Sequence, residues 1–229
     1  MDQIAILMKK GAIEVAPRSQ RGTGFYSRFF LIRKKTGDWR PILDLCSLNK
    51  YLKKQSFRMI SLQDVLRLLN RGDFMTSLDL QDAYFHIPIH PNHRKFLRFK
   101  VAGIHYQFRV LPFGLRSAPR VFTKVLAPVA AHLRQLGVQV FPYLDDWLIK
   151  ARTTSKAARD METCLSLFGA LGLTVNYPKS HLDPTKNITF LGAILDTVHA
   201  KATASQDRRK KLRDLAARLS KRKSASVRT

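Results

Sequence analysis

The sequence predicts an α+β fold, with an antiparallel sheet backed by helices. Three observations support this class: apolar runs with the alternation of strands, longer stretches with helical spacing, and their order along the chain, which is strand, helix, hairpin, helix, strand. The chain has 229 residues, of which 45% are hydrophobic, enough for the core of one large domain or of two small ones.

The first predicted elements are two strands joined by a tight turn. Residues 25–35 contain the aromatic and branched side chains that favour strands, residues 36–38 are Thr-Gly-Asp, and residues 39–45 return as a second strand. Basic side chains gather at the end of this predicted hairpin.

A short helix and a strand are predicted next. Ser61 and Asp64 have the spacing of a capping box, so we expect a helix to begin there and to end near Gly72. Residues 74–80 alternate as a strand does, and Asp79 lies on its polar face.

The middle of the chain predicts a second hairpin and a long helix. Residues 96–111 are extended on both sides of a turn at Ala102–Gly103. The Ser-Ala-Pro sequence at 117–119 begins the helix, Pro128 is expected to kink it, and Gly137 ends it. Its predicted buried stripe consists of Val121, Phe122, Val125, Val129, Leu133 and Leu136.

A third hairpin and a second long helix follow. Residues 138–144 and 147–150 are apolar strands joined at Asp145–Asp146, and a helix covers roughly 155–171. The side chains expected to face inward are Met161, Leu165, Phe168 and Leu171. Two further strand-like segments are residues 173–177 and 188–195.

The chain is strongly basic. Forty-one Lys and Arg against sixteen Asp and Glu give a net charge of +25 and a pI near 10.7. Because basic side chains that contact phosphates release bound counterions, this excess predicts a polyanionic partner such as a nucleic acid. The alternative is a basic protein whose charge serves solubility.

Several classes of protein are disfavoured. No apolar run reaches the length of about 18 residues that a membrane span needs. The N-terminus has an acid at position 2 and an early Lys pair, unlike a secretory signal. Cys46 and Cys164 lie far apart, which argues against a cysteine-based zinc site or a disulfide framework. We therefore expect a reducing compartment, the cytoplasm or the nucleus.

The C-terminal segment, residues 198–229, differs in composition from the rest. It contains eleven Lys or Arg and two Asp. It could be a disordered basic tail or the first helix of a further domain. The second interpretation is favoured by the helical spacing of Leu212, Leu215, Ala216 and Leu219.

Three carboxylates occupy special positions. Asp79 ends one predicted strand, and Asp145 and Asp146 form the tip of a predicted hairpin. The apolar runs beside them would bury the strands and leave the acids at an edge. Mg²⁺ requires oxygen ligands, and two such ions about 3.5–4 Å apart promote phosphoryl transfer. The alternative is that the Asp pair only forms a turn, as Asp often does.

Six segments resemble the motifs of reverse transcriptases, in the order that this family has them. Tyr-Leu-Asp-Asp at 143–146 matches the Tyr-x-Asp-Asp signature, and residues 78–88 resemble the first catalytic motif. The other four are the fingers motif at 39–50, the nucleotide-pocket motif at 111–119, the lysine loop at 175–180 and the primer-grip hairpin at 188–192. The amino-acid sequence of these motifs is most similar to that of gypsy-like and tyrosine-recombinase (DIRS-type) retrotransposons.

The resemblance implies a right-hand polymerase fold with fingers and palm. The implied divisions are fingers at 1–54 and 87–118, palm at 55–86 and 119–197, and the incomplete basic start of a thumb or connection at 198–229. Family members of this kind continue into a thumb, a connection and a ribonuclease H domain. We expect those regions in the full-length polyprotein.

The resemblance also implies an activity, RNA-directed DNA polymerase. Deoxynucleotides would be transferred from their triphosphates to a primer 3′-hydroxyl on an RNA or DNA template. The implied metal ligands are Asp79, Leu80, Asp145 and Asp146, around two Mg²⁺ ions, with Mn²⁺ as the alternative metal. Asp79 and Asp145 would bridge both ions, and Asp146 would support them.

Further residues match family positions that contact the nucleotide. Tyr84 would be the steric gate that clashes with a ribose 2′-hydroxyl, and Asp82 and Ala83 would offer backbone N–H groups to the triphosphate. Lys34 and Arg40 would clamp the phosphates. The hairpin length differs by one residue from better-known relatives, which leaves Lys35 and Arg33 as alternatives to Lys34.

Three other segments have implied roles. Phe113 and Gly114 would form the floor under the incoming base, although some viral members have a glutamine in place of the phenylalanine. Lys179 would protonate the departing pyrophosphate, with a surface lysine as the alternative. The residues that would position the primer terminus, or simply pack as a strand, are Phe190, Leu191 and Gly192.

Two other functions compete with this hypothesis. An RNA-copying RNA polymerase usually has Gly-Asp-Asp and no bulky gate, so Tyr84 and Leu144 argue against it. A catalytically silent nucleic-acid-binding fragment would need no carboxylates, and all three are intact. The sequence therefore favours retained chemistry.

Overall fold

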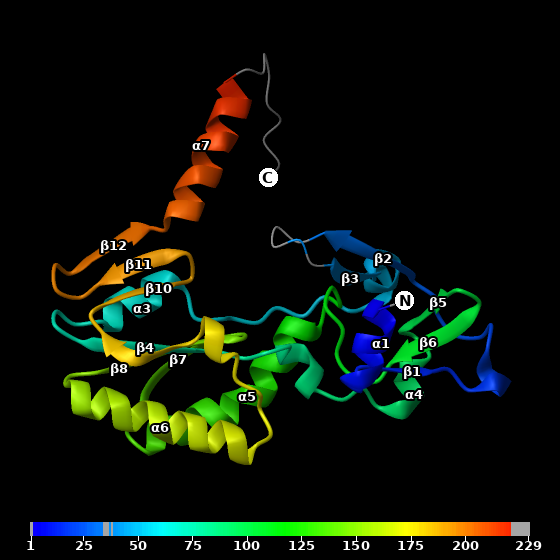
Figure 1. Ribbon diagram of the computed structural model, residues 1–229, viewed down its shortest axis with the longest axis horizontal. Coiled ribbons are helices and arrows are strands. Elements are labelled where there is room, and N and C mark those ends of the chain that lie inside the picture. The colour runs from blue at the N-terminus through cyan, green and yellow to red at the C-terminus, as the bar shows by residue number, and fades with distance from the viewer. Residues whose placement is uncertain (1, 34–36, 38, 221–229) are drawn as a thin grey trace. The chain divides into compact units, whose positions relative to one another are not determined.

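The computed structural model describes residues 2–33, 37 and 39–220, and its fold is of the α+β class (Figure 1). Every strand ladder in this part of the chain is antiparallel. The helices are α1 (Asp2–Lys9), α2 (Cys46–Tyr51), α3 (Leu62–Leu68), α4 (Pro91–Arg94), α5 (Ala118–Gln135), α6 (Thr154–Ala170) and α7 (Gln206–Ser220), with 3₁₀ turns η1 (Arg18–Gln20), η2 (Ala83–His86) and η3 (Tyr177–Lys179).

The strands are short, as expected for antiparallel hairpins. They are β1 (Ile13–Val15), β2 (Arg28–Arg33), β3 (Trp39–Asp44), β4 (Phe74–Asp79), β5 (Arg98–Val101), β6 (Ile104–Phe108), β7 (Gln139–Tyr143), β8 (Asp146–Ala151), β9 (His181–Thr185), β10 (Asn187–Phe190), β11 (Ala193–Asp196) and β12 (Lys201–Ala204).

The chain forms two compact units, and it passes between them several times. Unit 1 consists of Met1–Met59, Leu80–Val129 and Gly169–Thr174, and unit 2 consists of Ile60–Asp79, Ala130–Phe168 and Val175–Thr229. None of the helices among the described residues combines the length and apolar character needed to cross a membrane.

Unit 1 contains the sheet β1-β6-β5 and the hairpin β2–β3. Aromatic rings fill its interior: Phe99 is fully buried and stacks on Phe29 at 4.6 Å and on Tyr106 at 5.5 Å. The predicted basic hairpin is confirmed, since β2 pairs with β3 from Arg28 opposite Asp44 to Arg33 opposite Trp39.

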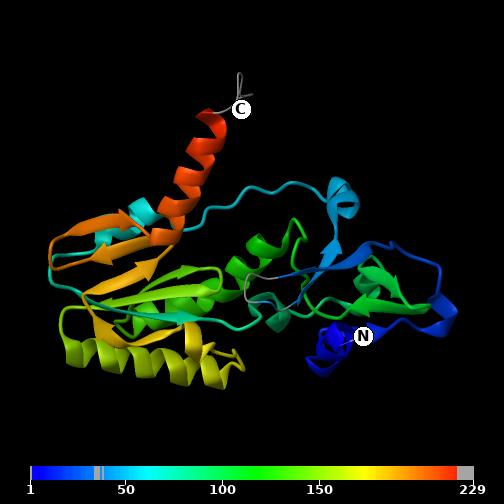
Figure 2. The ribbon, with the colours of Figure 1, turned by 45° about the horizontal axis from the view of Figure 1, so that its top comes forward.

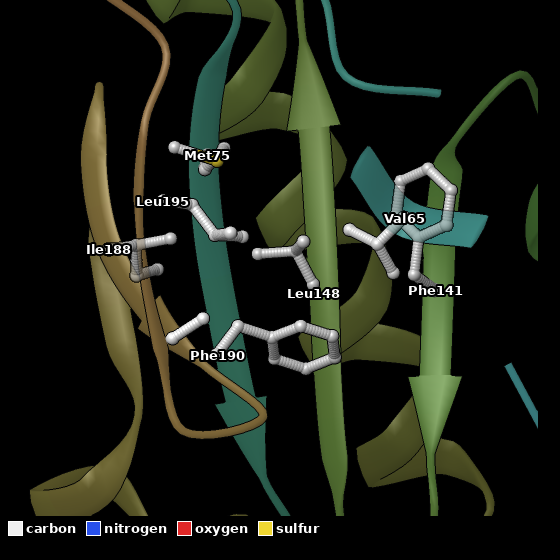
Figure 3. Packing of buried hydrophobic residues seen from close by; sticks show 8 residues of the cluster. Val65, Met75, Phe141, Leu148, Ile188, Phe190 and Leu195 are labelled. Atoms are coloured by element: carbon white, nitrogen blue, oxygen red, sulfur yellow. The ribbon is translucent and has the colours of Figure 1, made fainter. Parts of the chain in front are cut away.

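Unit 2 is built on the four-stranded sheet β7-β8-β4-β9. On one face, Trp147 of β8 meets Phe168 of α6 edge to face, with ring centroids 5.0 Å apart. On the other face, Met75 and Leu148 pack with α3 and the β10–β11 hairpin (Figure 3). The buried cluster on that face comprises Val65, Met75, Phe141, Leu148, Ile188, Phe190, Ala193 and Leu195.

The predicted capping box is present in unit 2. Ser61 Oγ accepts a hydrogen bond from Asp64 N at 3.2 Å, and Asp64 Oδ2 accepts one from Ser61 N at 2.9 Å. Together these bonds satisfy two backbone donors at the start of α3. Val65 of this helix is then fully buried in the cluster.

The buried stripe of α5 differs from the predicted one. Phe122 and Leu133 are buried as predicted, and so are Ala118, Leu126 and Ala130, whereas Val125 and Leu136 are about half exposed. The apolar residues form a stripe wider than the face that packs, so their spacing alone could not select which of them would be buried. On α6, Leu171 is likewise exposed and lies beyond the last helical residue.

The strand prediction after α6 is also corrected. Residues 173–177 form no strand apart from a bridge at Val175, and β9 lies instead at His181–Thr185. Asp183 and Pro184 give this segment little strand propensity. Proline is tolerated here because β9 is the edge strand of its sheet.

The predicted strand segment at 188–195 forms the β10–β11 hairpin, and the chain continues from it to the C-terminal part of unit 2. β12 adds a third strand to the β10–β11 hairpin, and α7 begins two residues after it (Figures 1 and 2). The predicted helical spacing is thus confirmed by α7. Its apolar side chains Leu212, Leu215 and Leu219 are exposed.

Candidate active site

Two acidic side chains face each other at one end of unit 2's sheet. Asp79 is the last residue of β4 and Asp146 is the first of β8, and the antiparallel register places them directly opposite. Each carboxyl group is close enough to affect the pKa of the other. Strand pairing thus holds together two groups that repel each other when both are ionised.

The pKa values reflect this crowding. Burial, and then the negative charges of Asp145 and Asp79, raise the pKa of Asp146 to about 6. The pKa of Asp79 is also raised, mainly by burial and by Asp145, although the nearby ammonium of Lys179 opposes the rise. Negative charge is therefore concentrated at a point where a cation would relieve it.

The third acid, Asp145, lies in the two-residue loop between β7 and β8. Tyr143 pairs with Asp146, so Leu144 and Asp145 form the tip of the hairpin. Leu144 has a positive φ of 53°, a strained conformation for a branched side chain. The carbonyl of Leu144 accepts a hydrogen bond of 3.1 Å from Trp147 Nε1, which anchors the tip to the sheet.

The loop after α6 fixes the backbone of Asp79. Asn176 N donates to the Asp79 carbonyl at 2.8 Å, and Asp79 N donates to Ser180 Oγ at 3.0 Å. Ser180 Oγ in turn donates to the Asn176 carbonyl at 2.9 Å. Sequence reasoning identified this segment for Lys179 and missed both positioning residues, although they flank that lysine in the same motif.

Lys179 lies beside the acid pair. Its Nζ is 3.9 Å from Asp79 Oδ1, and its side chain is 68% exposed, so the amine can reach solvent or a ligand. A cavity of about 180 Å³ adjoins these groups. It is lined by Ser77, Leu78, Asp79, Asp146, Lys179, Thr189, Phe190, Leu191 and Gly192.

The β10–β11 turn forms one wall of this cavity. Leu191 and Gly192 both have positive φ, 49° and 73°, and connect the paired residues Phe190 and Ala193. Phe190 is buried in the core cluster (Figure 3). Arg208 of α7 donates to the Leu191 carbonyl at 3.3 Å and so ties the turn to that helix.

The carboxylates of Asp79, Asp145 and Asp146 are the kind of ligand that binds divalent cations. Within the described residues, no three His, Cys, Asp or Glu side chains are already arranged as a metal-binding group. Asp79 and Asp146 lie directly opposite in the strand pair, and Asp145 is next to Asp146 in the chain. A set of three neighbouring carboxylates supplies the anionic oxygen ligands that Mg²⁺ prefers, so the residues fit this metal. Leu80, the other predicted ligand, is a buried residue directly after Asp79.

Unit 1 contains the residues that match nucleotide-contact positions. Tyr84 is buried in the turn η2, where its ring lies 4.9 Å from that of Phe113 and 5.6 Å from that of Phe122. Asp82 precedes this turn with a left-handed backbone, φ 49°, and forms an ion pair of 2.5 Å with Lys10. Ala83 is buried as well.

The loop that contains Phe113 and Gly114 is held by a residue that sequence reasoning missed. Asn49 Nδ2 donates to the Gly114 carbonyl at 2.8 Å, and Asn49 Oδ1 accepts from Arg116 N at 2.8 Å. Gly114 has a φ of 89°, which favours glycine, and Phe113 is half exposed. Asn49 lies in the 39–50 motif, which was the signal that could have identified it.

The predicted phosphate clamp is only partly described. Arg40 lies on β3 opposite Ile32, and its side chain is exposed. Arg33 ends β2 and is also exposed. Lys34 and Lys35 lie outside the described residues.

His86, at the end of η2, is a further residue that sequence reasoning missed. Its Nδ1 lies 3.0 Å from the Ala83 carbonyl, and its Nε2 lies 3.0 Å from the backbone N of Thr174. Thr174 also accepts a hydrogen bond of 2.8 Å from Gln81 N. No local pattern could have revealed a partner 88 residues away.

Comparison with known proteins gives a consistent result. The profile of the family described as "Reverse transcriptase (RNA-dependent DNA polymerase)" matches residues 32–195. The Pol polyprotein of the transposon gypsy from Drosophila melanogaster is 30% identical over 156 residues, which cover 68% of this chain and 15% of that protein. The genome polyprotein of Petunia vein clearing virus (isolate Shepherd) is 26% identical over 167 residues, covering 71% of this chain and 8% of that polyprotein.

Solved structures share the fold. A foamy viral protease–reverse transcriptase in complex with double-stranded DNA superposes with a TM-score of 0.76 at 21% identity, covering 97% of this chain and 36% of that one. The chain thus spans only a small part of the length of these relatives. Because the family profile matches most of its residues, the chain belongs to the reverse transcriptase (RNA-dependent DNA polymerase) family.

Proposed function

We propose that this chain is the catalytic core of an RNA-directed DNA polymerase encoded by a retrotransposon polyprotein. The observation that carries the proposal is the placement of Asp79 directly opposite Asp146, with Asp145 beside them at the hairpin tip. Family membership supports the same reaction. The net charge of +25 supports an RNA or DNA primer–template as partner.

The three aspartates, with the carbonyl of Leu80, would hold two Mg²⁺ ions. When bound, such ions lower the pKa of an attacking hydroxyl and neutralise charge on the phosphates. Lys179, close to Asp79 and exposed, can deliver a proton to the departing pyrophosphate. The cavity beside the β10–β11 turn supplies space for the end of a primer.

The nucleotide contacts of unit 1 follow from the resemblance. Tyr84 would exclude a ribose 2′-hydroxyl, and the backbone of Asp82 and Ala83 would meet the triphosphate. Phe113 and Gly114 would form the floor under the base. Arg40, together with Lys34, would bind phosphate oxygens.

The finer origin of the chain is proposed as gypsy-like or DIRS-type, consistent with its identity to the gypsy Pol polyprotein. In that case the fingers comprise 1–54 and 87–118, the palm 55–86 and 119–197, and residues 198–229 begin the thumb or connection. A ribonuclease H region would be part of the full-length polyprotein, and the protein would act in the cytoplasm or nucleus. A ribonuclease H pattern downstream in the same reading frame would support this origin.

The proposal is tested by primer extension on RNA and DNA templates. Wild-type protein should add deoxynucleotides in the presence of Mg²⁺, and Asp145→Asn should reduce extension by at least about 100-fold because a metal ligand is lost. Gel-shift binding of the primer–template should be unchanged in this variant. Ribonucleotide addition in place of deoxynucleotide addition would indicate an RNA polymerase, and binding without extension would indicate a silent fragment.

A second measurement does not depend on activity. If the acids hold Mg²⁺, the ion should raise the melting temperature of the wild type, and EDTA should reverse the rise. Asp145→Asn should weaken the response. Equal responses in the two proteins would mean that the ion binds elsewhere.

A further inference from the structure

The turn η2 is held by a histidine ring that donates one hydrogen bond and accepts another. His86 is half-buried, and its two ring nitrogens lie 3.0 Å from the Ala83 carbonyl and 3.0 Å from the Thr174 N–H. Both partners are backbone groups of unit 1. The ring therefore connects the turn that carries Tyr84 to a segment far away in the sequence.

The partners determine where the proton of the ring must lie. A carbonyl oxygen can only accept, so Nδ1 must donate to Ala83. A backbone N–H can only donate, so Nε2 must accept from Thr174. Only the neutral ring with its proton on Nδ1 makes both bonds, and a proton on Nε2 would break the contact with Thr174.

These two bonds act on the backbone around Tyr84. The Ala83 carbonyl belongs to the peptide group that joins Ala83 to Tyr84, so His86 fixes the plane of that peptide. Thr174 binds His86 through its N–H and Gln81 through its carbonyl, and so it clamps both ends of the turn. Within the turn, Ile87 N donates to the Tyr84 carbonyl at 3.1 Å.

The ring of Tyr84 depends on this backbone for its place. It packs against the rings of Phe113 and Phe122, and aromatic packing of this kind tolerates small shifts of the ring. A gate that reads one hydroxyl group on a sugar needs a fixed position within a fraction of an ångström. The polar contacts of His86 supply a directional constraint on the backbone, in addition to the aromatic packing.

We propose that His86, in its Nδ1-protonated neutral form, is a positioning residue that sets the ability of Tyr84 to discriminate deoxynucleotides from ribonucleotides. The inference rests on the proposed function, in which Tyr84 is the gate. It assigns to His86 no contact with the substrate. Its effect is transmitted through the Ala83–Tyr84 peptide.

Three substitutions of His86 distinguish the contributions of its two hydrogen bonds. His86→Asn keeps a donor at the position of Nδ1, His86→Gln keeps an acceptor at the position of Nε2, and His86→Phe keeps the ring without either. The measured quantity is the ratio of kcat/KM for a deoxynucleotide to that for the matching ribonucleotide. We expect His86→Phe to lower this ratio roughly 10-fold, as the loss of two neutral hydrogen bonds allows, with the Asn and Gln variants between it and the wild type.

A matched control is His93→Phe, since His93 is an exposed histidine of α4 in the same unit. This variant should keep the wild-type ratio. Melting temperatures of all variants identify any that are unfolded, and if His86→Phe is unfolded the Asn and Gln variants carry the test. An unchanged ratio in folded His86 variants would overturn the inference.

The test separates the inference from the proposed function. Tyr84→Ala should abolish most of the discrimination; if it does not, the gate itself is wrong. If Tyr84→Ala lowers the ratio and His86→Phe does not, only the positioning role is wrong. Independently of activity, nitrogen NMR of histidine-labelled protein should show the His86 proton on Nδ1, and a proton on Nε2 would contradict the inference.

Discussion

At one end of the β4–β8 strand pair a buried carboxylate is neutralised, whereas at the other end two carboxylates face each other. Asp73, which precedes β4, is fully buried and lies 2.8 Å from Lys150 Nζ and 3.3 Å from Arg152 Nη1. Lys150 also donates to the Leu68 carbonyl. At the far end of the same two strands the two acids lie opposite each other, and Lys179, which is outside the ladder, is 3.9 Å from Asp79 Oδ1.

The pKa values at the two ends move in opposite directions. Burial alone would raise the pKa of Asp73, but hydrogen bonds from Lys150 and Asn70 and the charge of Lys150 outweigh it, and the pKa is lowered. Burial and like charges raise the pKa of Asp146. The difference teaches that cations of the neighbouring strand offset the burial of the carboxylate at one end of the sheet, whereas burial and mutual repulsion outweigh the charge of Lys179 at the other.

The largest expected loss of stability comes from removing the amine that neutralises Asp73. Lys150→Met should destabilise the protein by about 3 kcal/mol because it leaves the Asp73 carboxylate buried without its amine. Urea denaturation measures this change. The double substitution Lys150→Met with Asp73→Asn should recover part of the loss.

A second ion pair in the same unit allows a comparison. Lys156 Nζ lies 2.8 Å from Asp160 Oδ1 on α6; Asp160 is buried, but the lysine side chain is 40% exposed, so water can take its place beside the carboxylate. Lys156→Met should therefore cost less than Lys150→Met, about 1 kcal/mol. Equal costs for the two lysine substitutions would show that the buried pair has no special role.

A smaller change, here a gain in stability, is expected when one carboxylate of the acid pair is removed. The folded state binds the Asp146 proton more tightly than the unfolded chain, because the pKa rises from 3.8 to about 6. This group therefore stabilises the metal-free fold below 3.8, and the contribution is lost as the pH rises through about 6. Asp146→Asn should accordingly be more stable than the wild type at high pH, by about 1 kcal/mol after allowance for solvent screening.

The measurement is urea denaturation in EDTA at several pH values. The advantage of Asp146→Asn should disappear at low pH, where the wild-type carboxyl is protonated. It should also shrink when Mg²⁺ is added at high pH, since the ion would relieve the repulsion only in the wild type. An advantage independent of pH would mean that charge is not its cause.

The smallest expected change in stability concerns the loop that fixes Asp79. Ser180→Ala removes the acceptor of the Asp79 N–H and should cost about 0.5–1 kcal/mol. If the hydroxyl positions the metal ligand, kcat of primer extension should fall roughly 10-fold with little change in nucleotide KM. Ser180→Thr keeps the hydroxyl and should restore activity; failure of this rescue would indicate a purely steric role for Ser180.

Local signals in the sequence determined much of this protein. The capping box of α3, the β7–β8 hairpin and the strand ending at Asp79 are each encoded within a few consecutive residues, although the hairpin tip is Leu144–Asp145, one residue before the predicted Asp145–Asp146. The motifs around them were sufficient to identify the family and to select the three aspartates. Their cross-strand register came only with the structure.

Other features were decided by tertiary packing alone. Part of the buried stripe of α5 and the edge strand β9 were predicted wrongly, because an apolar stripe wider than the packed face and a segment with Asp183 and Pro184 carry weak local signals. His86 and Ser180 have ordinary sequence surroundings, and their partners lie far along the chain, 88 residues away for one and 101 for the other. Short-range propensities cannot specify such contacts, because these form only when distant segments are brought together by burial of the core.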